Sequence, residues 1–433
     1  MRIKKLELKN FRGFEELVID FPEGESGLAV FVGVNGSGKT SVLEGILSLL
    51  YTYYYELFKN EKVINGDYRN FEYCSIGDRL TDFHFSVYIS ERKLTIEVQG
   101  KEISIINELT NYAGSISISK LTNPWINKFV TEDNLIKIRE SLLNNISVFV
   151  YYPAKRAITQ DLSLKARDIS AIQPINVYLG AFAQSINFND FFEWFRSFED
   201  VENEQIRAKG NAQFRIKELE TVRNAISKLK LLEAVTDFRV QRQPHEDFIL
   251  EKNERKLSIK SLSDGEKMLI ALTGDIARRL NIANSELNNP LEGHGIVLID
   301  EIEQHLHPDW QRKVVKSLRD TFPNIQFILT THSPQVLSTL KKENVFILDN
   351  FQLVQDTPHT YGRDSNSILW DIFGVEKRPP ESKEIFSKLY RMMDDPDKVE
   401  ETEALLRDVE ERYGYYDEEV VRARGQFEFL NED

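Results

Sequence analysis

Apolar and polar residues follow two different periods along this chain, and the changes of period outline its elements. Apolar residues alternate with polar ones over 5–9 and 16–21, and a continuous apolar run covers 27–32. These runs predict three strands. Apolar residues then recur three and four positions apart, which predicts a helix after Lys39. The residues that set this helical spacing are Val42, Leu43, Ile46, Leu47 and Leu50.

A period of two returns between residues 83 and 98. Two apolar sets keep this alternation, and the polar residues 90–92 separate them. The sets are Phe83, Phe85, Val87 and Ile89, followed by Leu94, Ile96 and Val98. The pattern predicts a β-hairpin with its turn at 90–92, within an antiparallel sheet beside the main core. A strongly apolar strand follows at 146–152.

The segment 189–232 contains no proline and is rich in Glu, Lys, Arg and aromatic residues. It predicts two or more helices without a sustained heptad, which favours a compact helical insertion over a long coiled-coil arm. Short strands near 238–240 and 248–250 lead to a helix start at 262–266. A strand, helix and strand series over 295–349 completes a parallel α/β core.

We therefore predict an α/β fold divided into four segments. They are an N-terminal lobe over 1–188, the helical insertion over 189–235, a C-terminal lobe over 236–355 and an acidic helical region over 356–433.

The composition limits the cellular environment and the binding partners that we expect for this chain. The 433 residues carry a net charge of −14, which argues against non-specific coating of nucleic acid by the chain. The single cysteine, Cys74, excludes an intrachain disulfide, and no apolar run is long enough for a membrane span of about 18 residues. We expect a cytoplasmic protein. Residues 391–433 hold fifteen acidic and six basic residues, which favours either a solvated helical face or a docking surface for a basic partner.

A glycine-rich loop supplies the first chemical motif. Gly33 and Gly38–Lys39–Thr40 are separated by four residues, after a predicted strand and before a predicted helix. In this context the backbone N–H groups cradle phosphates, the lysine reaches the β and γ phosphates, and the threonine hydroxyl binds Mg²⁺. The predicted phosphate-binding residues are Asn35, Gly36, Ser37, Gly38, Lys39, Thr40 and Ser41.

Two further motifs stand at the ends of apolar runs. The run 296–299 predicts a buried parallel strand, and Asp300 and Glu301 follow at its carboxyl end, where open α/β sheets bind ligands. We expect Asp300 to hold Mg²⁺ through water and Glu301 to polarise the attacking water as a general base. His332 closes the next predicted strand, over 327–331, and is predicted to sense the γ-phosphate.

The fourth motif is Leu262-Ser263-Asp264-Gly265-Glu266 at a predicted helix start. The hydroxyl of Ser263 and the N–H of Gly265 suit a γ-phosphate. The same string is also an ordinary helix cap, with Glu266 completing a capping box.

These four motifs, in this order, resemble the ABC-type ATPase heads of the SMC, Rad50 and RecF group. The resemblance implies a phosphate-loop parallel sheet with an antiparallel β subdomain, and ATP and Mg²⁺ as ligands. It also implies paired heads, in a homodimer or higher even oligomer, where Ser263 and Gly265 contact the ATP of the partner copy. Asn10–Phe14 (NFRGF) resembles the N-terminal motif whose arginine, here Arg12, contacts nucleotide. Gln160 matches the Q-loop glutamine, a metal ligand.

Two other stretches, 191–204 and 360–379, together with the acidic end, are similar to the PtuA-type defence ATPases. These act with a separate HNH nuclease in Septu systems and some retrons, so the resemblance implies such a partner. OLD nucleases share the head but add a TOPRIM domain, whose acidic constellation this sequence lacks after residue 349. Three hypotheses remain: an ATPase that gates a partner nuclease, a RecF-like DNA-binding ATPase in repair or chromosome maintenance, and a non-hydrolysing nucleotide sensor.

Overall fold

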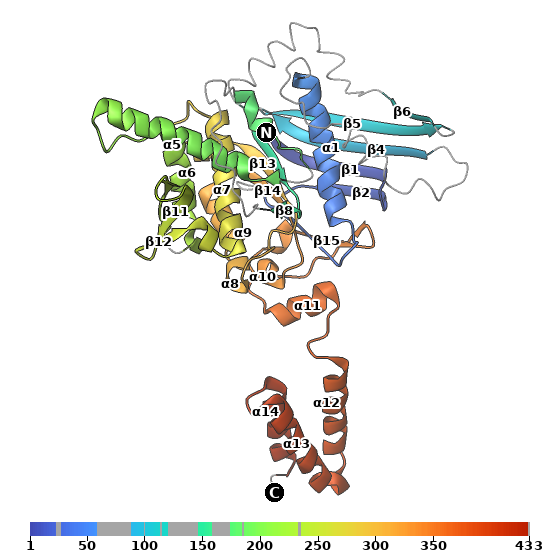
Figure 1. The fold of residues 1–433 in the computed structure, drawn as a ribbon. Helices are drawn as coiled ribbons and strands as arrows, with labels where there is room; N and C mark the ends of the chain where they lie inside the picture. Colours follow the sequence, from blue (N-terminus) through green and yellow to red (C-terminus); the bar gives the residue numbers. More distant parts are fainter. Residues whose placement is uncertain are drawn as a thin grey trace. The chain divides into compact units, whose positions relative to one another are not determined.

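The computed structural model divides the chain into two compact units, Met1–Ile368 and Leu369–Asp433 (Figure 1). The residues that it describes are 1–22, 27–58, 88–98, 100–112, 115–119, 146–157, 174–183, 186–232 and 235–431. The predicted division into four segments stays a prediction.

The core of the first unit is a sheet in the order β16-β15-β3-β14-β13-β7, in which every neighbouring pair except β15–β16 is parallel. The strands are β3 (Ala29–Val32), β7 (Val148–Tyr152), β13 (Gly295–Ile299), β14 (Ile325–Thr331), β15 (Val345–Asp349) and β16 (Gln352–Leu353). All residues of β3, β7, β13 and β14 are buried, as expected for strands covered on both faces. The parallel core that the apolar runs predict is therefore present.

A second sheet is antiparallel and has the order β2-β1-β4-β5-β6. Its strands are β1 (Arg2–Phe11), β2 (Phe14–Asp20), β4 (Tyr88–Val98), β5 (Lys101–Tyr112) and β6 (Ser115–Ser119). Helix α1 (Lys39–Phe58) contacts β1, β4 and β5 of this sheet and also β14 of the parallel sheet. It therefore joins the two sheets. The mixed α/β architecture with an antiparallel subdomain agrees with the predicted fold class.

The predicted turn at 90–92 is wrong. Strand β4 runs through it, and the reversal to β5 follows Val98, which pairs with Lys101. The reason lies in Arg92, which is only 3% exposed. Its guanidinium donates to Ser48 Oγ at 3.0 Å and lies 5.1 Å from the centre of the Phe11 ring. A charged residue that α1 and β1 accommodate thus occupies a buried strand position. Of the apolar set that begins this predicted hairpin, residues 83–87 lie outside the described residues.

The helical insertion consists of α5 (Asn189–Lys209) and α6 (Lys217–Lys228), and a small sheet of order β10-β11-β12 accompanies it. Both helices contact α7 (Asp264–Ala283), and Figure 1 shows the insertion on the side of the parallel core away from the antiparallel sheet. The insertion is compact, as its lack of heptads predicts. The small strands are β10 (Thr236–Gln241), β11 (Asp247–Lys252) and β12 (Arg255–Ser258), and β8 (Arg156–Ala157) pairs with β9 (Ile186–Asn187).

Short helices connect the strands of the core. They are η3 (Pro174–Tyr178), η4 (Lys230–Leu232), η5 (Ile259–Ser261), η6 (Pro290–Glu292), α8 (Pro308–Gln311), α9 (Val314–Thr321), α10 (Pro334–Leu337) and η7 (Lys342–Asn344). Helix α11 (Ser365–Phe373) runs across the boundary between the two units. None of the described helices is long and apolar enough to cross a membrane.

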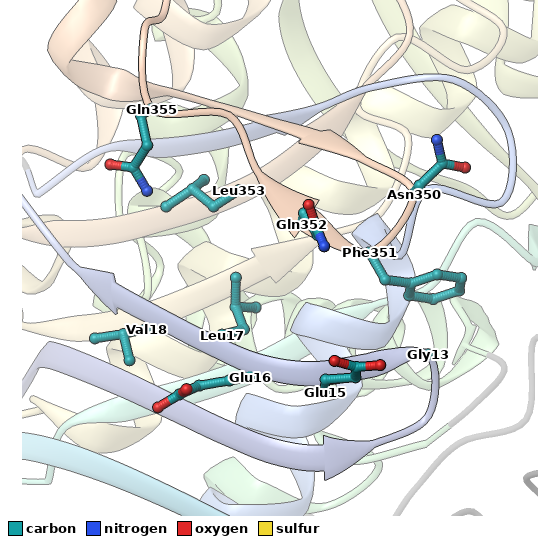
Figure 2. Close-up of a pocket in the computed structure, with 10 residues that line it drawn as sticks. All are labelled: Gly13, Glu15, Glu16, Leu17, Val18, Asn350, Phe351, Gln352, Leu353 and Gln355. Atoms are coloured by element: carbon teal, nitrogen blue, oxygen red, sulfur yellow. The ribbon is translucent and has the colours of Figure 1, made fainter.

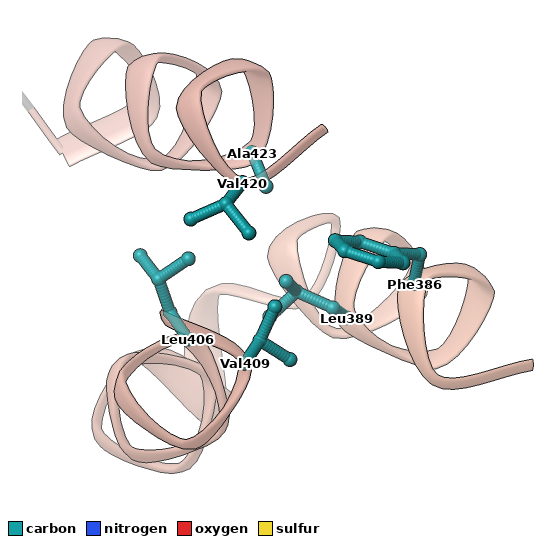
Figure 3. Packing of buried hydrophobic residues seen from close by; sticks show 6 residues of the cluster. All are labelled: Phe386, Leu389, Leu406, Val409, Val420 and Ala423. Carbon is teal, nitrogen blue, oxygen red and sulfur yellow. The ribbon is translucent and has the colours of Figure 1, made fainter. Parts of the chain in front are cut away.

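The second unit packs its helices around a small apolar core (Figure 3). The helices are α12 (Pro380–Met393), η8 (Pro396–Lys398), α13 (Val399–Tyr413) and α14 (Glu418–Asn431). The core residues are Phe386, Leu389, Leu406, Val409, Val420 and Ala423. Each of α12, α13 and α14 contributes two of these residues, so the three helices stabilise one another.

Candidate nucleotide site

The glycine-rich loop connects β3 to α1 at the carboxyl end of the parallel sheet. Gly36 and Gly38 have φ angles of 81° and 103°, a region that favours glycine. Lys39 is 6% exposed, and its Nζ donates to the carbonyls of Gly33 at 3.0 Å and Val34 at 2.9 Å. Burial lowers the pKa of Lys39, whereas the neighbouring Asp300 raises it. The lysine is therefore folded back over its own loop, with its donors satisfied by carbonyl oxygens.

The turn that contains Phe351 packs against the glycine-rich loop. A Cβ atom on Gly38 would lie 2.6 Å from the Phe14 ring and 2.8 Å from the Phe351 ring, and one on Gly13 would lie 2.5 Å from the Phe351 ring. Figure 2 shows Phe351 and Gly13 on a groove of about 460 Å³. The N–H of Phe351 donates to the carbonyl of Ser37 at 3.3 Å. Sequence reasoning missed Phe351, because no local motif connects this turn to the loop.

Thr40 and Asp300 are 260 residues apart in sequence but share a hydrogen bond. Thr40 Oγ1 donates to Asp300 Oδ2 at 3.0 Å, and Thr330 Oγ1 donates to Asp300 Oδ1. A hydroxyl and a carboxylate that converge beside a phosphate loop form a donor set that fits Mg²⁺, which prefers oxygen ligands and keeps waters and phosphate oxygens as the others. In the described part of the chain, no cluster of three His, Cys, Asp or Glu residues offers a ready-made metal site.

Glu301 follows Asp300 in the left-handed backbone region, with φ of 50°. This region is unfavourable for a non-glycine residue. Its N–H donates to Thr330 Oγ1 at 2.7 Å, and its carbonyl accepts from Arg156 at 2.7 Å. The carboxylate makes no hydrogen bond or ion pair with another described residue. It is therefore available to a ligand or a water molecule.

His332 directly follows β14, and Glu303 holds its backbone. The backbone N–H of His332 donates to Glu303 Oε1 at 2.5 Å, and Thr331 Oγ1 donates to Glu303 Oε2 at 2.8 Å. Burial and the charge of Lys39 lower the pKa of His332, whereas Asp300 raises it. The imidazole is thus neutral near pH 7. Sequence reasoning missed Glu303, although its position two residues after Glu301 could have suggested a supporting carboxylate.

The Leu262–Glu266 segment starts α7 and makes a capping box. Glu266 N–H donates to Ser263 Oγ at 3.3 Å, and Ser263 N–H donates to Glu266 Oε2 at 2.8 Å. A Cβ on Gly265 would lie 2.5 Å from the His305 carbonyl oxygen, so this glycine permits a close approach to the loop after Glu301. Among the described residues, no hydrogen bond connects Ser263 or Gly265 to the phosphate loop. The cap interpretation therefore describes the local structure, and Ser263 stays exposed.

Three predicted site residues remain: two lie near the phosphate loop, and one lies outside the described residues. Arg12, with φ of 52°, donates to Ser41 Oγ at 3.3 Å and pairs with Glu44 on α1, which places it beside the phosphate loop. Asn35 is exposed at the tip of the loop. The structure therefore brings both residues to the same edge of the sheet as Lys39. Gln160 lies outside the described residues.

Comparison with known proteins assigns a class to this arrangement. Residues 1–337 match the model of a family described as the AAA ATPase domain. The match covers more than half of the chain, and the chain belongs to this ATPase family.

More specific similarities extend over most of the chain. The Retron Vc95 probable ATPase of Vibrio cholerae serotype O1 biovar El Tor is 30% identical over 418 residues, which cover 85% of this chain and 78% of that protein. The Septu protein PtuA of Bacillus thuringiensis is 24% identical over 420 residues, which cover 94% and 92% of the two chains. The resemblance to PtuA-type and retron ATPases is thereby confirmed.

One solved structure that is similar to this chain is an SMC head bound to the C-winged helix domain of ScpA. It has a TM-score of 0.46 and 14% sequence identity, and the match covers 82% of this chain and 98% of that chain.

Proposed function

We propose that this chain binds ATP with Mg²⁺, hydrolyses it at the edge of the parallel sheet, and uses ATP-dependent head pairing to regulate a partner nuclease in anti-phage defence. The observation that carries the proposal is the hydrogen bond from Thr40 to Asp300, which joins the phosphate loop to the carboxylate pair that ends β13. The confirmed similarity to retron and Septu ATPases supports the biological role.

In this proposal each residue acts at a defined position. Lys39 leaves the loop carbonyls and turns to the β and γ phosphates, while the loop N–H groups cradle their oxygens. Thr40 and Asp300 would hold Mg²⁺, which would neutralise charge on the phosphate oxygens. Glu301, whose carboxylate is bonded to no described residue, accepts a proton from the attacking water. Neutral His332 contacts the γ-phosphate.

Pairing follows from the position of Ser263 and Gly265. They stand at the N-terminus of α7, a helix of 20 residues, where the backbone dipole favours an anion. No described hydrogen bond engages them with the phosphate loop of their own chain. We infer that a second copy of the head presents its nucleotide to them, so that a homodimer or higher even oligomer forms around ATP.

A separate HNH nuclease is the partner that we propose, and the second unit is its proposed docking element. This unit is acidic and exposes large apolar side chains, with Tyr416 89% exposed and Phe429 76% exposed. An acidic surface with exposed aromatic side chains suits a basic protein partner. Co-purification with an HNH protein encoded beside this gene, and its loss when residues 369–433 are deleted, would test this part.

The variant Glu301→Gln tests the chemistry. It keeps the size of the side chain but removes the base, so phosphate release should fall by about 10²-fold or more while ATP binding persists. Because hydrolysis no longer dissolves the pair, dimers should accumulate with ATP, as measured by light scattering after size exclusion. Glu343→Gln, on the exposed η7, is the control. Undiminished phosphate release from Glu301→Gln would refute the base assignment.

A further inference from the structure

Arg156 connects the edge strand of the core to the proposed catalytic turn. Strand β7 pairs with β13 so that Tyr152 lies opposite Ile299, and the Asp300 N–H donates to the Tyr152 carbonyl at 2.9 Å. Four residues after Tyr152, the Arg156 side chain is only 5% exposed. One of its terminal nitrogens donates to the carbonyl of Asp300 and the other to the carbonyl of Glu301.

The turn that Arg156 reaches is unusual in its backbone. Glu301 occupies the left-handed region, which side chains with a Cβ adopt only when their surroundings impose it. Thr330 holds the N–H of Glu301, and Arg156 holds its carbonyl. The peptide groups on both sides of the Glu301 Cα are thus fixed, whereas its carboxylate is bonded to no described residue. The backbone hydrogen bonds therefore fix the point from which the Glu301 side chain leaves the turn.

We propose that Arg156 is a positioning residue for hydrolysis, which holds the Asp300–Glu301 turn in the backbone conformation that aims the Glu301 carboxylate at the attacking water. This inference rests on the proposed function of Glu301 as the base. Arg156 does not reach the substrate in this role. It acts through the two consecutive carbonyls that it binds.

A simpler role for a buried cation here is to balance the charge of nearby carboxylates. Burial lowers the pKa of Arg156 below its usual value, and the charges of Asp300, Glu303 and Glu301 oppose this shift. However, every hydrogen bond that the guanidinium makes goes to a main-chain carbonyl, including that of Pro153 at 3.1 Å, and no ion pair to a described carboxylate is formed. The planar fork of arginine can bind two adjacent carbonyls at once, whereas a lysine ammonium supplies the charge without that geometry.

The variant Arg156→Lys therefore separates charge from geometry. We expect its turnover number for ATP to fall by about 10²-fold, since small misplacements of a catalytic group cost on that order. Its dissociation constant for ATP should change less than about threefold, because the phosphate loop is untouched. Lys155→Met, which removes the adjacent exposed cation, and Arg92→Lys, which alters a buried guanidinium away from the turn, should leave both values unchanged.

A second measurement does not depend on hydrolysis. Backbone hydrogen exchange of the nucleotide-free protein, followed by mass spectrometry on peptides covering 300–303, should be faster in Arg156→Lys than in wild type and in both controls. If the wild type itself shows no turnover, the proposed function fails, and the exchange result still decides whether Arg156 fixes the turn. Unchanged turnover in Arg156→Lys, parallel loss of ATP binding and turnover, or unchanged exchange would each overturn the positioning role.

Discussion

The phosphate loop and the Leu262–Glu266 segment were both predicted to contact ATP, but their hydrogen-bond partners in the structure differ. Residues of the loop are bonded to groups hundreds of residues away, as in the hydrogen bond from Thr40 to Asp300. Among the described residues, Ser263 bonds only to Glu266 and Lys267, within its own helix start. The first region is assembled by the fold of one chain. In the second, the hydrogen bonds of Ser263 stay within the helix start, although Glu266 pairs with Lys252 and Gly265 lies close to the His305 carbonyl.

This difference fits the proposed site that two copies of the chain share. A region that cooperates with its own chain must be positioned by tertiary contacts before ligand binds. A region that serves another chain needs only local stability, and the capping box provides this at about 1 kcal/mol. The comparison can be tested by variants that affect one region and spare the other.

The largest effect is expected in the phosphate loop. Lys39→Ala removes the cation that neutralises the phosphates, and it should abolish nucleotide binding, with a loss of affinity above about 10²-fold. Titration with a fluorescent ATP analogue would measure this. Lys267→Ala, in the first turn of α7, is the matched control and should bind like wild type. Equal losses of ATP affinity in Lys39→Ala and Lys267→Ala would contradict the proposed difference between the two regions.

A second variant should spare binding and block pairing. Ser263→Arg places a bulky side chain where the partner's nucleotide would dock, so monomers should bind ATP normally but neither pair nor release phosphate. Ser263→Asn keeps a good helix cap without the bulk and controls for loss of the capping hydroxyl. A mixture of Ser263→Arg and Lys39→Ala chains should regain phosphate release, because one intact composite site can form. Normal turnover by Ser263→Arg alone would contradict the trans role.

A third variant concerns the contact beneath the cap. Gly265→Ala would place its Cβ 2.5 Å from the backbone oxygen of His305, so the start of α7 must shift. We expect a loss of stability of about 1–3 kcal/mol, visible as a lower Tm, together with weaker ATP-dependent dimerisation. At Gly36 an added Cβ meets nothing within 4 Å, but its φ of 81° is unfavourable for alanine. Gly36→Ala should therefore weaken ATP binding and lower the Tm less than Gly265→Ala does, because only backbone strain of about 1 kcal/mol is added.

The last prediction concerns stability alone, with no expected effect on ATP binding, and lies in the insertion that contacts α7. Burial raises the pKa of Glu199 to about 7, opposed by a hydrogen bond from Val240 and by Arg242 and Arg223. Between pH 4.5 and 7 the folded state binds the proton more tightly than the unfolded state, so this group's stabilising contribution is present below that window and is lost as the pH rises through it. The loss is on the order of 2–3 kcal/mol.

Glu199→Gln should weaken the pH dependence of the free energy of unfolding. Urea unfolding at pH 5 and pH 8, followed through the fluorescence of buried Trp194 on the same helix, would measure it. Glu204→Gln, at an exposed position of that helix, should keep the wild-type dependence. An unchanged slope in Glu199→Gln would show that the titrating group lies elsewhere.

Much of the fold follows from periodicity and motif context. The buried strands of the parallel sheet, the helix after Lys39, the compact insertion and the start of α7 all agree with the predictions, because each depends on local spacing and on capping chemistry. The prediction that failed, the turn at 90–92, treated Arg92 as a solvent-exposed turn residue. Its burial depends on Phe11 and Ser48, which are distant in sequence, so no local pattern could reveal it.

The sequence by itself determined which residues we propose for the nucleotide chemistry, because the loop glycines, Lys39, the Asp300–Glu301 pair and the cap at Ser263 occur in fixed local contexts. Only the tertiary structure decided what holds these residues in place. Phe351 supports the loop, and Arg156 binds the Asp300–Glu301 turn, through contacts that join segments more than a hundred residues apart. Such supports depend on the pairing order of the strands, and a linear pattern carries no information about which strand ends become neighbours.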